Sequence, residues 1–236
     1  MNMTGQAYAA ASARRSGAEA SRRQPPVSAS QALSLAGACV LAMAVVWSLA
    51  ELVPAVHLRD AVALHDFTQL SRPGIDDVGR VLLHLLDPLL FVTWGVALTA
   101  IALARSRPRV ALAIAVVMGL APLTSELLKP LLAHPNDTVE GVQIGAASWP
   151  SGHATAALAL VLCAVLAVAP RWRPLIATVG GAYALAVGLA LLILAWHTPS
   201  DVIGGYLVAT FWTALAVAGL SAAELRWPSR ATPGAR

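Results

Sequence analysis

Histidine, lysine and aspartate side chains stand at the edges of long apolar segments in this sequence. His153 follows the run Pro150-Ser151-Gly152, His197 lies four residues before Asp201, and Lys129 is the single lysine of the chain. Ionisable groups beside apolar segments that cross a membrane are energetically costly, so each is first treated as a functional candidate. Together, these residue types are suited to binding a phosphate group and to proton transfer around it.

The segment around His153 suits the binding of an oxyanion at the start of a helix. The backbone N–H groups of Ser151, Gly152 and His153 would lie at a helix amino terminus, where unpaired donors and the helix dipole favour a phosphate. Gly152 lets the backbone approach an oxyanion closely. Lys129 would supply a compact positive charge to the phosphoryl oxygens. Pro150 and Ser151 also fit an ordinary helix start, so this segment alone does not decide the matter.

The spacing of His197 and Asp201 permits the carboxylate to hold the far N–H of the imidazole. A neutral imidazole held in this way can attack phosphorus. His153 would then protonate the leaving oxygen as a general acid. A purely structural role for Asp201 stays open, because Thr198-Pro199-Ser200-Asp201 resembles a capping box. Lys129 also has an alternative, as a side chain that reaches the membrane interface.

Composition predicts that membrane helices position these residues. Of the 236 residues, 58% are hydrophobic and 12% are charged, whereas soluble chains average about 25% charged residues. A helix needs about 20 apolar residues to cross the hydrocarbon core. The sequence therefore predicts an all-α polytopic membrane protein with a six-transmembrane-helix bundle. The six apolar segments are residues 32–54, 82–104, 109–129, 152–169, 174–195 and 200–222.

The remaining segments predict short tails and one long first loop. Residues 1–30 are rich in Ala, Ser, Arg and Pro, and we expect a disordered cytoplasmic tail there. Residues 31–223 would form the membrane domain, and residues 224–236 a short cytoplasmic tail. Residues 55–81 form the first outer loop, whose pattern fits a short helix along the membrane interface.

The distribution of basic residues predicts the orientation of the chain in the membrane. With a cytoplasmic amino terminus, twelve arginines fall on the inner side and four basic residues on the outer side, a clear positive-inside bias. The net charge of +4 therefore reports orientation in the plasma membrane, and no nucleic-acid partner is expected. The four outer basic residues are Arg59, Arg72, Arg80 and Lys129.

The same order of spans collects the chemical residues on the outer face. The chain between His153 and His197 forms one helix inward, an arginine-rich turn and one helix outward, so both imidazoles emerge on the same side. Lys129 ends a span that runs outward, and Asp201 begins the last span. The sequence thus predicts a histidine-based site for phosphate esters at the outer surface of the membrane.

With these motifs, the chain resembles the type 2 phosphatidic acid phosphatase superfamily of membrane lipid phosphatases. That family carries Lys-x6-Arg-Pro, then Pro-Ser-Gly-His, then Ser-Arg-x5-His-x3-Asp. The second motif is intact at residues 150–153, the second half of the third lies at residues 197–201, and the first survives as Lys129. The resemblance covers roughly residues 80–222, and the order and spacing of the motifs are more specific than any one motif.

The resemblance implies a role for each of these residues. His197 would be the nucleophile that becomes phosphohistidine, Asp201 would orient it, and His153 would be the general acid. No metal ion or cofactor is implied. Family members act on phosphatidic acid, phosphatidylglycerol phosphate, polyprenyl pyrophosphates and related lipids. The residues that would bind the substrate phosphate are Lys129, Ser151 and Gly152.

Both arginines of the family motifs are absent from this chain. Asn136-Asp137 stands where the first motif has Arg-Pro, and Ala190-Leu191 stands where the third has Ser-Arg. The loss of an arginine–phosphate contact costs a few kcal/mol of transition-state stabilisation, so turnover would fall by orders of magnitude without compensation. His134, near the first lost arginine, and Arg80, at the border of the second span, are the candidates for compensation. Arg80 also fits an ordinary interfacial anchor.

The leading hypothesis is a lipid phosphatase that hydrolyses a phosphomonoester or a pyrophosphate. One alternative is a catalytically weak relative that binds or moves a phospholipid or assists a partner membrane protein. Another is a phosphotransferase that passes the phosphoryl group to an acceptor other than water. Retention of both histidines and the aspartate favours an enzyme, because a pure binder needs no nucleophile.

Two further side-chain pairs are expected beside the predicted site. Glu126 lies one turn before Lys129, a spacing at which opposite charges pair on a helix. His84 and Asp87 are three residues apart, and we expect them either to pair with each other or to face the site.

Overall fold

The computed structural model describes residues 27–134 and 144–228, and all regular elements in these two ranges are helical. The prediction of an all-α fold is therefore confirmed. The elements in chain order are α2 (Ala29–Leu52), α3 (Pro54–Thr68), α4 (Pro73–His84), α5 (Pro88–Ala104), α6 (Pro108–Leu131), α7 (Gly152–Ala167), the short 3-10 helix η1 (Pro170–Trp172), α8 (Arg173–Ile193) and α9 (Pro199–Arg226).

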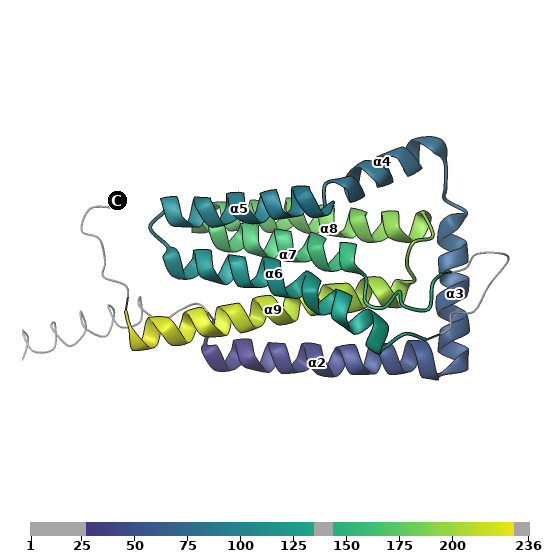
Figure 1. The fold of residues 1–236 in the computed structure, drawn as a ribbon, viewed down its shortest axis with the longest axis horizontal. Helices are drawn as coiled ribbons and strands as arrows, with labels where there is room; N and C mark the ends of the chain where they lie inside the picture. Colours follow the sequence, from purple (N-terminus) through teal and green to yellow (C-terminus); the bar gives the residue numbers. More distant parts are fainter. Residues whose placement is uncertain (1–26, 135–143, 229–236) are drawn as a thin grey trace, which may run out of the picture.

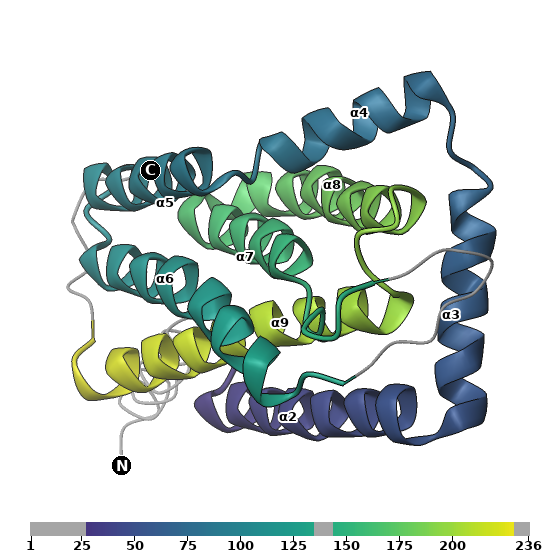
Figure 2. The ribbon, with the colours of Figure 1, turned by 45° about the vertical axis from the view of Figure 1, so that its right-hand side comes forward.

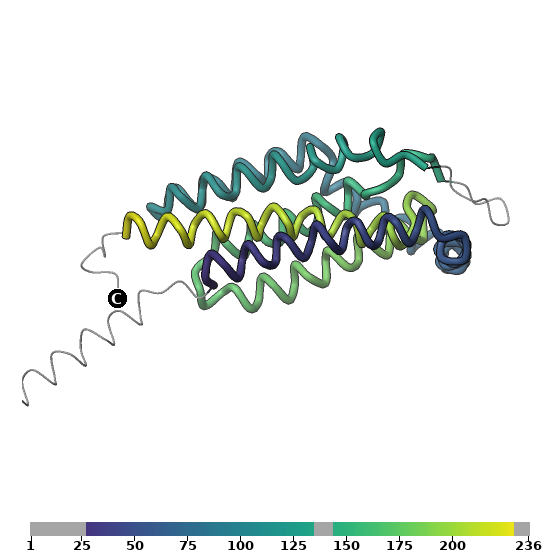
Figure 3. Tube along the Cα trace, turned by 90° about the horizontal axis from the view of Figure 1, so that it is seen from below, coloured from purple at the N-terminus to yellow at the C-terminus, as the bar shows by residue number. Residues whose placement is uncertain are grey.

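Six of these helices, α2 and α5 to α9, lie side by side in a bundle, and α3 lies across one end of it (Figures 1 and 2). In Figure 3, α3 is seen along its own axis while the bundle helices are seen from the side. The last helix, α9, packs against α2, α6 and α7, and α7 packs in turn against α5, α6 and α8. We call the end that α3 covers the site end, because the amino termini of α7 and α9 also lie there.

The membrane spans agree with the sequence prediction in kind and approximately in number. In the described ranges, α2, α6, α9 and the continuous stretch of η1 and α8 are long and apolar enough to cross a membrane. The pair α4 and α5 also qualifies when taken together, although it is bent by 54° at its break. Helix α7 is equally apolar but has only 16 residues. The protein is thus a multi-pass membrane protein, and the six predicted segments correspond to the six helices of the bundle.

The region between the first two predicted spans differs in detail from the expectation. Instead of one short interfacial helix, residues 55–81 contain α3 and most of α4. The predicted span 82–104 is interrupted, because α4 ends at His84 and α5 begins only at Pro88. Proline lacks a backbone N–H and cannot continue a helix from the preceding turn without losing a hydrogen bond, but it fits the first helical position.

Close packing of α7 against α9 sets the geometry of the site end. A Cβ atom added to Gly205 would lie 2.5 Å from the carbonyl oxygen of Ser151 and 3.0 Å from the backbone nitrogen of Thr155. The Thr155 hydroxyl donates a hydrogen bond to the Gly205 carbonyl (3.1 Å). Small residues at this position let the two backbones touch, which is how membrane helices commonly associate.

We expect Gly205→Ala to destabilise the protein, because the added methyl group would collide with backbone atoms that cannot move away independently. Overpacking of this kind typically costs about 1–3 kcal/mol. Thermal unfolding in detergent would measure the effect. Gly181→Ala on α8 is the matched control, since a Cβ atom at Gly181 would meet nothing within 4 Å. Equal melting temperatures for the two variants would show that the α7–α9 contact is not tight.

Candidate functional site

The two histidines predicted to share one site do lie at the same end of the bundle. His153 is the second residue of α7, and His197 lies in the turn between α8 and α9. The ring of Trp196, the neighbour of His197, contacts the His153 ring edge to face, with centroids 5.6 Å apart. His197 and Lys129 are both close enough to His153 to interact with it electrostatically. The structure therefore brings the two histidines to one end of the bundle, as the order of the spans predicted.

His197 is held by a fully buried carboxylate. Its Nδ1 atom lies 3.1 Å from Oδ2 of Asp201, whose side chain is 1% exposed, while that of His197 is 12% exposed. The Ser148 hydroxyl donates to Oδ1 of Asp201 (3.2 Å), and the Thr198 N–H donates to Oδ2 (3.0 Å). A carboxylate bound to Nδ1 keeps the proton there, which leaves the imidazole lone pair on Nε2.

Asp201 also caps its own helix, so its hydrogen bond to His197 and its capping box occur together. The Asp201 N–H donates to the Thr198 hydroxyl (3.3 Å) while the Asp201 carboxylate accepts the Thr198 N–H. This reciprocal pair is a capping box at the start of α9, and Pro199 occupies the first helical position. The same carboxylate therefore fixes the beginning of α9 and the orientation of the His197 ring.

The start of α7 offers two of the three backbone donors that the sequence predicted. The Ser151 N–H is already bound to the carbonyl oxygen of Asp201 (2.9 Å), because α7 and α9 pack closely at this point. The Ser151 hydroxyl caps α7 by accepting the Ala154 N–H (3.3 Å). Gly152 and His153 begin the helix, and N–H groups at these positions have no intrahelical acceptor. The expectation of three donors is corrected to two.

Lys129 reaches the start of α7 together with Glu126. Lys129 Nζ lies 2.6 Å from Glu126 Oε1, so the pair expected from their spacing is confirmed. A Cβ atom added to Gly152 would lie 2.9 Å from the same Glu126 oxygen and 3.6 Å from Lys129 Nζ. The only lysine of the chain and the first residue of α7 are therefore neighbours, although their positions in the sequence differ by 23.

The two residues expected to compensate for the missing arginines are paired with acids. Arg80 Nη1 lies 3.0 Å from Asp77 Oδ1 on the exposed side of α4, and Asp77 is its salt-bridge partner within the described residues. His134 Nδ1 lies 3.4 Å from Oε2 of Glu51, a buried residue near the end of α2. Of the two lost arginine positions, residues 136–137 lie outside the described ranges, and Leu191 is fully buried in the apolar core.

His84 and Asp87 form the pair that the sequence left open, and Asp87 also lies near the site. Their side chains pair with each other, with Nδ1 of His84 3.0 Å from Oδ2 of Asp87. Asp87 is also close enough to His153 to interact with it electrostatically. The break between α4 and α5 therefore borders the site.

Asp60, which the sequence did not indicate as a site residue, ties α3 to the start of α9. The Asp60 carboxylate accepts hydrogen bonds from the Ser200 N–H (3.2 Å) and from the Ser200 hydroxyl (2.6 Å). Ser200 directly precedes Asp201 and lies 3.0 Å, hydroxyl to hydroxyl, from Thr198. Burial raises the pKa of Asp60 above its usual value, although the hydrogen bonds from Ser200 oppose this. In the sequence, Asp60 is only one of several polar residues in an amphipathic pattern.

The chain is similar to a known family and to a solved structure. The family model described as the PAP2 superfamily matches residues 88–224. The fold is similar to a crystal structure described as the first transmembrane PAP2 type phosphatidylglycerolphosphate phosphatase from Bacillus subtilis, with a TM-score of 0.66. The similarity covers 84% of this chain and 98% of that chain at 20% sequence identity, so it concerns the fold alone. No curated protein matches the sequence.

The contact between Asp60 and Ser200 predicts a pH-dependent stability. An acid whose pKa is raised by folding favours the folded state when protonated, so its contribution is present at low pH and is lost as the pH rises through the raised pKa. Asn at position 60 is always neutral. We expect the melting temperature of Asp60→Asn, relative to wild type, to increase between pH 4 and pH 7. Asp66→Asn, on the exposed side of the same helix, is the control, and parallel curves for all three proteins would refute the expectation.

Proposed function

Because the chain belongs to the PAP2 superfamily, we propose that it hydrolyses a phosphomonoester or pyrophosphate of a membrane lipid through a phosphohistidine. The observation that carries the proposal is the hydrogen bond between His197 and the buried Asp201, within electrostatic reach of His153. A nucleophile oriented by a carboxylate, with a second imidazole nearby, supplies the groups that such a reaction needs.

In the first step, Nε2 of His197 attacks phosphorus and the bond from phosphorus to the leaving oxygen breaks. Asp201 keeps the Nδ1 proton in place and stabilises the positive charge that develops on the ring. His153 donates a proton to the leaving oxygen, which departs as an alcohol or as a lipid phosphate. The N–H groups of Gly152 and His153, together with Lys129, bind the phosphoryl oxygens and stabilise their charge.

In the second step, a water molecule attacks the phosphohistidine on the side from which the alcohol left. The neutral His153 now accepts a proton from this water, and the bond between His197 and phosphorus breaks to release inorganic phosphate. Each histidine returns to its starting protonation state, so the cycle balances without a further reactant. The edge-to-face contact with Trp196 keeps the His153 ring beside His197 through both steps.

The proposed orientation places the site at the outer face of the plasma membrane. Arg105, Arg107 and Arg109 lie at the turn between α5 and α6, at the end of the bundle opposite α3 (Figure 1). Positively charged loops favour the cytoplasmic side, so the site end would face outward and both termini would be cytoplasmic.

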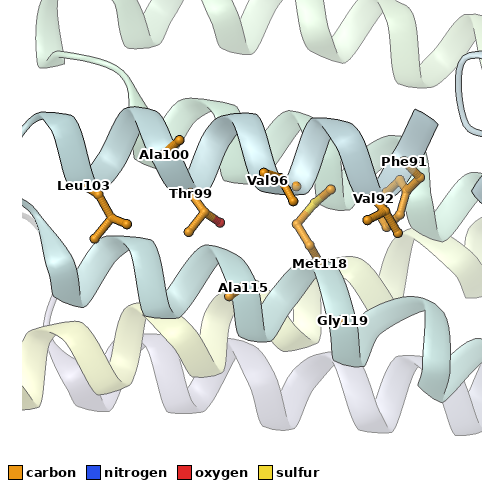
Figure 4. Close-up of a pocket in the computed structure, with 10 residues that line it drawn as sticks. Phe91, Val92, Val96, Thr99, Ala100, Leu103, Ala115, Met118 and Gly119 are labelled. Atoms are coloured by element: carbon orange, nitrogen blue, oxygen red, sulfur yellow. The ribbon is translucent and has the colours of Figure 1, made fainter. Parts of the chain in front are cut away.

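An apolar groove between α5 and α6 supports a lipid as the substrate (Figure 4). It has a volume of about 460 Å³. On α5 its lining begins at Phe91, one turn after Asp87, and ends at Leu103, and on α6 it includes Met118 and Gly119. At about 1.5 Å per helical residue, the lining of α5 extends about 18 Å away from the site end. We propose that one alkyl chain of the substrate lies in this groove while its phosphate reaches His197.

One observation favours the alternative of a catalytically weak relative. Leu191, at a position where the family carries arginine, is packed in the core, so no guanidinium reaches phosphate from there. Such a protein would bind a lipid phosphate at the same site but release phosphate very slowly. Lipid binding by the wild type without detectable release would support this alternative over hydrolysis.

The hydrolytic function predicts that His197→Ala lowers phosphate release by at least about a thousandfold, because no other group replaces the nucleophile. The assay would present phosphatidic acid, phosphatidylglycerol phosphate and a polyprenyl pyrophosphate in detergent micelles. His65→Ala on α3 removes a histidine that does not belong to the proposed site and should retain activity. Equal release by wild type and His197→Ala would remove the enzymatic proposal.

The groove predicts a dependence on chain length. Gly119→Phe would place a ring in the groove without disturbing the backbone, because a Cβ atom at Gly119 meets nothing within 4 Å. We expect kcat/KM to fall about tenfold or more for long-chain substrates and little for dihexanoyl analogues. Gly181→Phe introduces the same ring at an equally open position on α8, outside the groove. A chain-length preference unchanged from wild type would exclude the groove as the alkyl site.

A further inference from the structure

The carboxylate of Glu126 lies where an anionic substrate group would bind. Its Oε1 atom is 2.6 Å from Lys129 Nζ and would be 2.9 Å from a Cβ atom on Gly152, the first residue of α7. One carboxylate oxygen therefore lies beside both Lys129 and Gly152. The Glu126 side chain is 60% exposed, whereas that of Lys129 is 22% exposed. Glu126 can thus swing away, while Lys129 stays.

The charges around this point are nearly balanced. Lys129 contributes one positive charge, and the amino terminus of α7 contributes the equivalent of about half a charge. The carboxylate of Glu126 offsets most of this positive charge. Asp87 is a further acid, within electrostatic reach of His153. His197 faces the negative Asp201. His153 adds one positive charge only while it carries the proton for the leaving oxygen. A phosphate with two negative charges would therefore be compensated poorly at this site.

We propose that Glu126 is a specificity-determining residue that makes the site favour a phosphoryl group with one negative charge over one with two. The inference rests on the proposed phosphate site and adds the protonation state of its substrate: a phosphomonoester, or the terminal phosphate of a pyrophosphate, would bind best while it keeps one proton and therefore carries one negative charge. An incoming phosphate must displace the Glu126 carboxylate from Lys129 and then bind close to it. Each negative charge of the substrate is repelled by the displaced carboxylate, so a dianion is disfavoured about twice as strongly as a monoanion.

Two sources of a monoanionic phosphoryl group need to be distinguished. A phosphodiester carries one negative charge at any pH above about 2, whereas a phosphomonoester carries one only below its second pKa of about 6. Hexyl phosphate and its methyl ester, methyl hexyl phosphate, differ in this charge and share the same alkyl chain. At pH 8.5 hexyl phosphate is a dianion, and at pH 5 both compounds are monoanions.

The experiment measures the Kd of both compounds by calorimetric titration of the full chain in detergent, in a His197→Ala background that prevents turnover. At pH 8.5 we expect Glu126→Gln to lower the Kd of hexyl phosphate about tenfold and that of the methyl ester about threefold, from Coulomb repulsion at about 6 Å in a water-like medium. At pH 5 the two compounds should respond alike. Asp77→Asn is the matched control, because Asp77 forms an exposed pair of the same spacing with Arg80.

Each outcome decides the inference. The inference is supported if Glu126→Gln lowers the Kd of hexyl phosphate more than that of its methyl ester at pH 8.5. This difference must disappear at pH 5, and Asp77→Asn must not show it. The inference is overturned if Glu126→Gln lowers the Kd of both compounds equally or of neither, or if no variant binds them. The proposed hydrolysis is tested separately by phosphate release from the wild type. A protein that releases no phosphate but shows the charge-dependent Kd would lose the hydrolytic function and keep the inference.

Discussion

The structure of the site depends on the burial of one carboxylate, that of Asp201. A buried carboxylate without partners costs several kcal/mol, so its neighbours must supply donors to both oxygens. Here they come from three places: the hydroxyl of Ser148 before α7, the ring of His197 after α8, and the N–H of Thr198 at the start of α9. Satisfying this single group therefore brings together the loop before α7 and the turn between α8 and α9.

Helix packing provides the second condition, because lipid tails give little apolar driving force for one helix to bind another. At the site end, α7 and α9 are joined by backbone contact at Gly205 and by the bond from the Ser151 N–H to the Asp201 carbonyl. That bond removes one donor from the oxyanion site but fixes the remaining two relative to His197. Across the bundle end, Asp60 accepts hydrogen bonds from Ser200, so α3 also restrains the same helical turn.

The sequence predicted the features that depend on local spacing or on the direction of spans. His153 and His197 were expected together because a helical hairpin must return the chain to the face it left, and the capping box of Asp201 was visible in four consecutive residues. The contact of Asp60 with Ser200 joins positions 140 residues apart and depends on how α3 docks, which no pattern in one sequence encodes. The break before Pro88 did have a signal, which is the proline itself. The apolar residues on both sides of it nevertheless favoured the prediction of one continuous span.

The loss of both motif arginines changes how such a site must work. With one lysine, itself paired with Glu126, little fixed positive charge remains to stabilise a phosphoryl transition state. Catalysis would then rely more on the orientation of the nucleophile and on backbone N–H donors, because neither depends on the charge of an arginine. This is consistent with how firmly Asp201 is bound at both oxygens. If the site works as proposed, a firmly oriented His197 and a weakly charged phosphate site would together favour a phosphoryl group with a single negative charge.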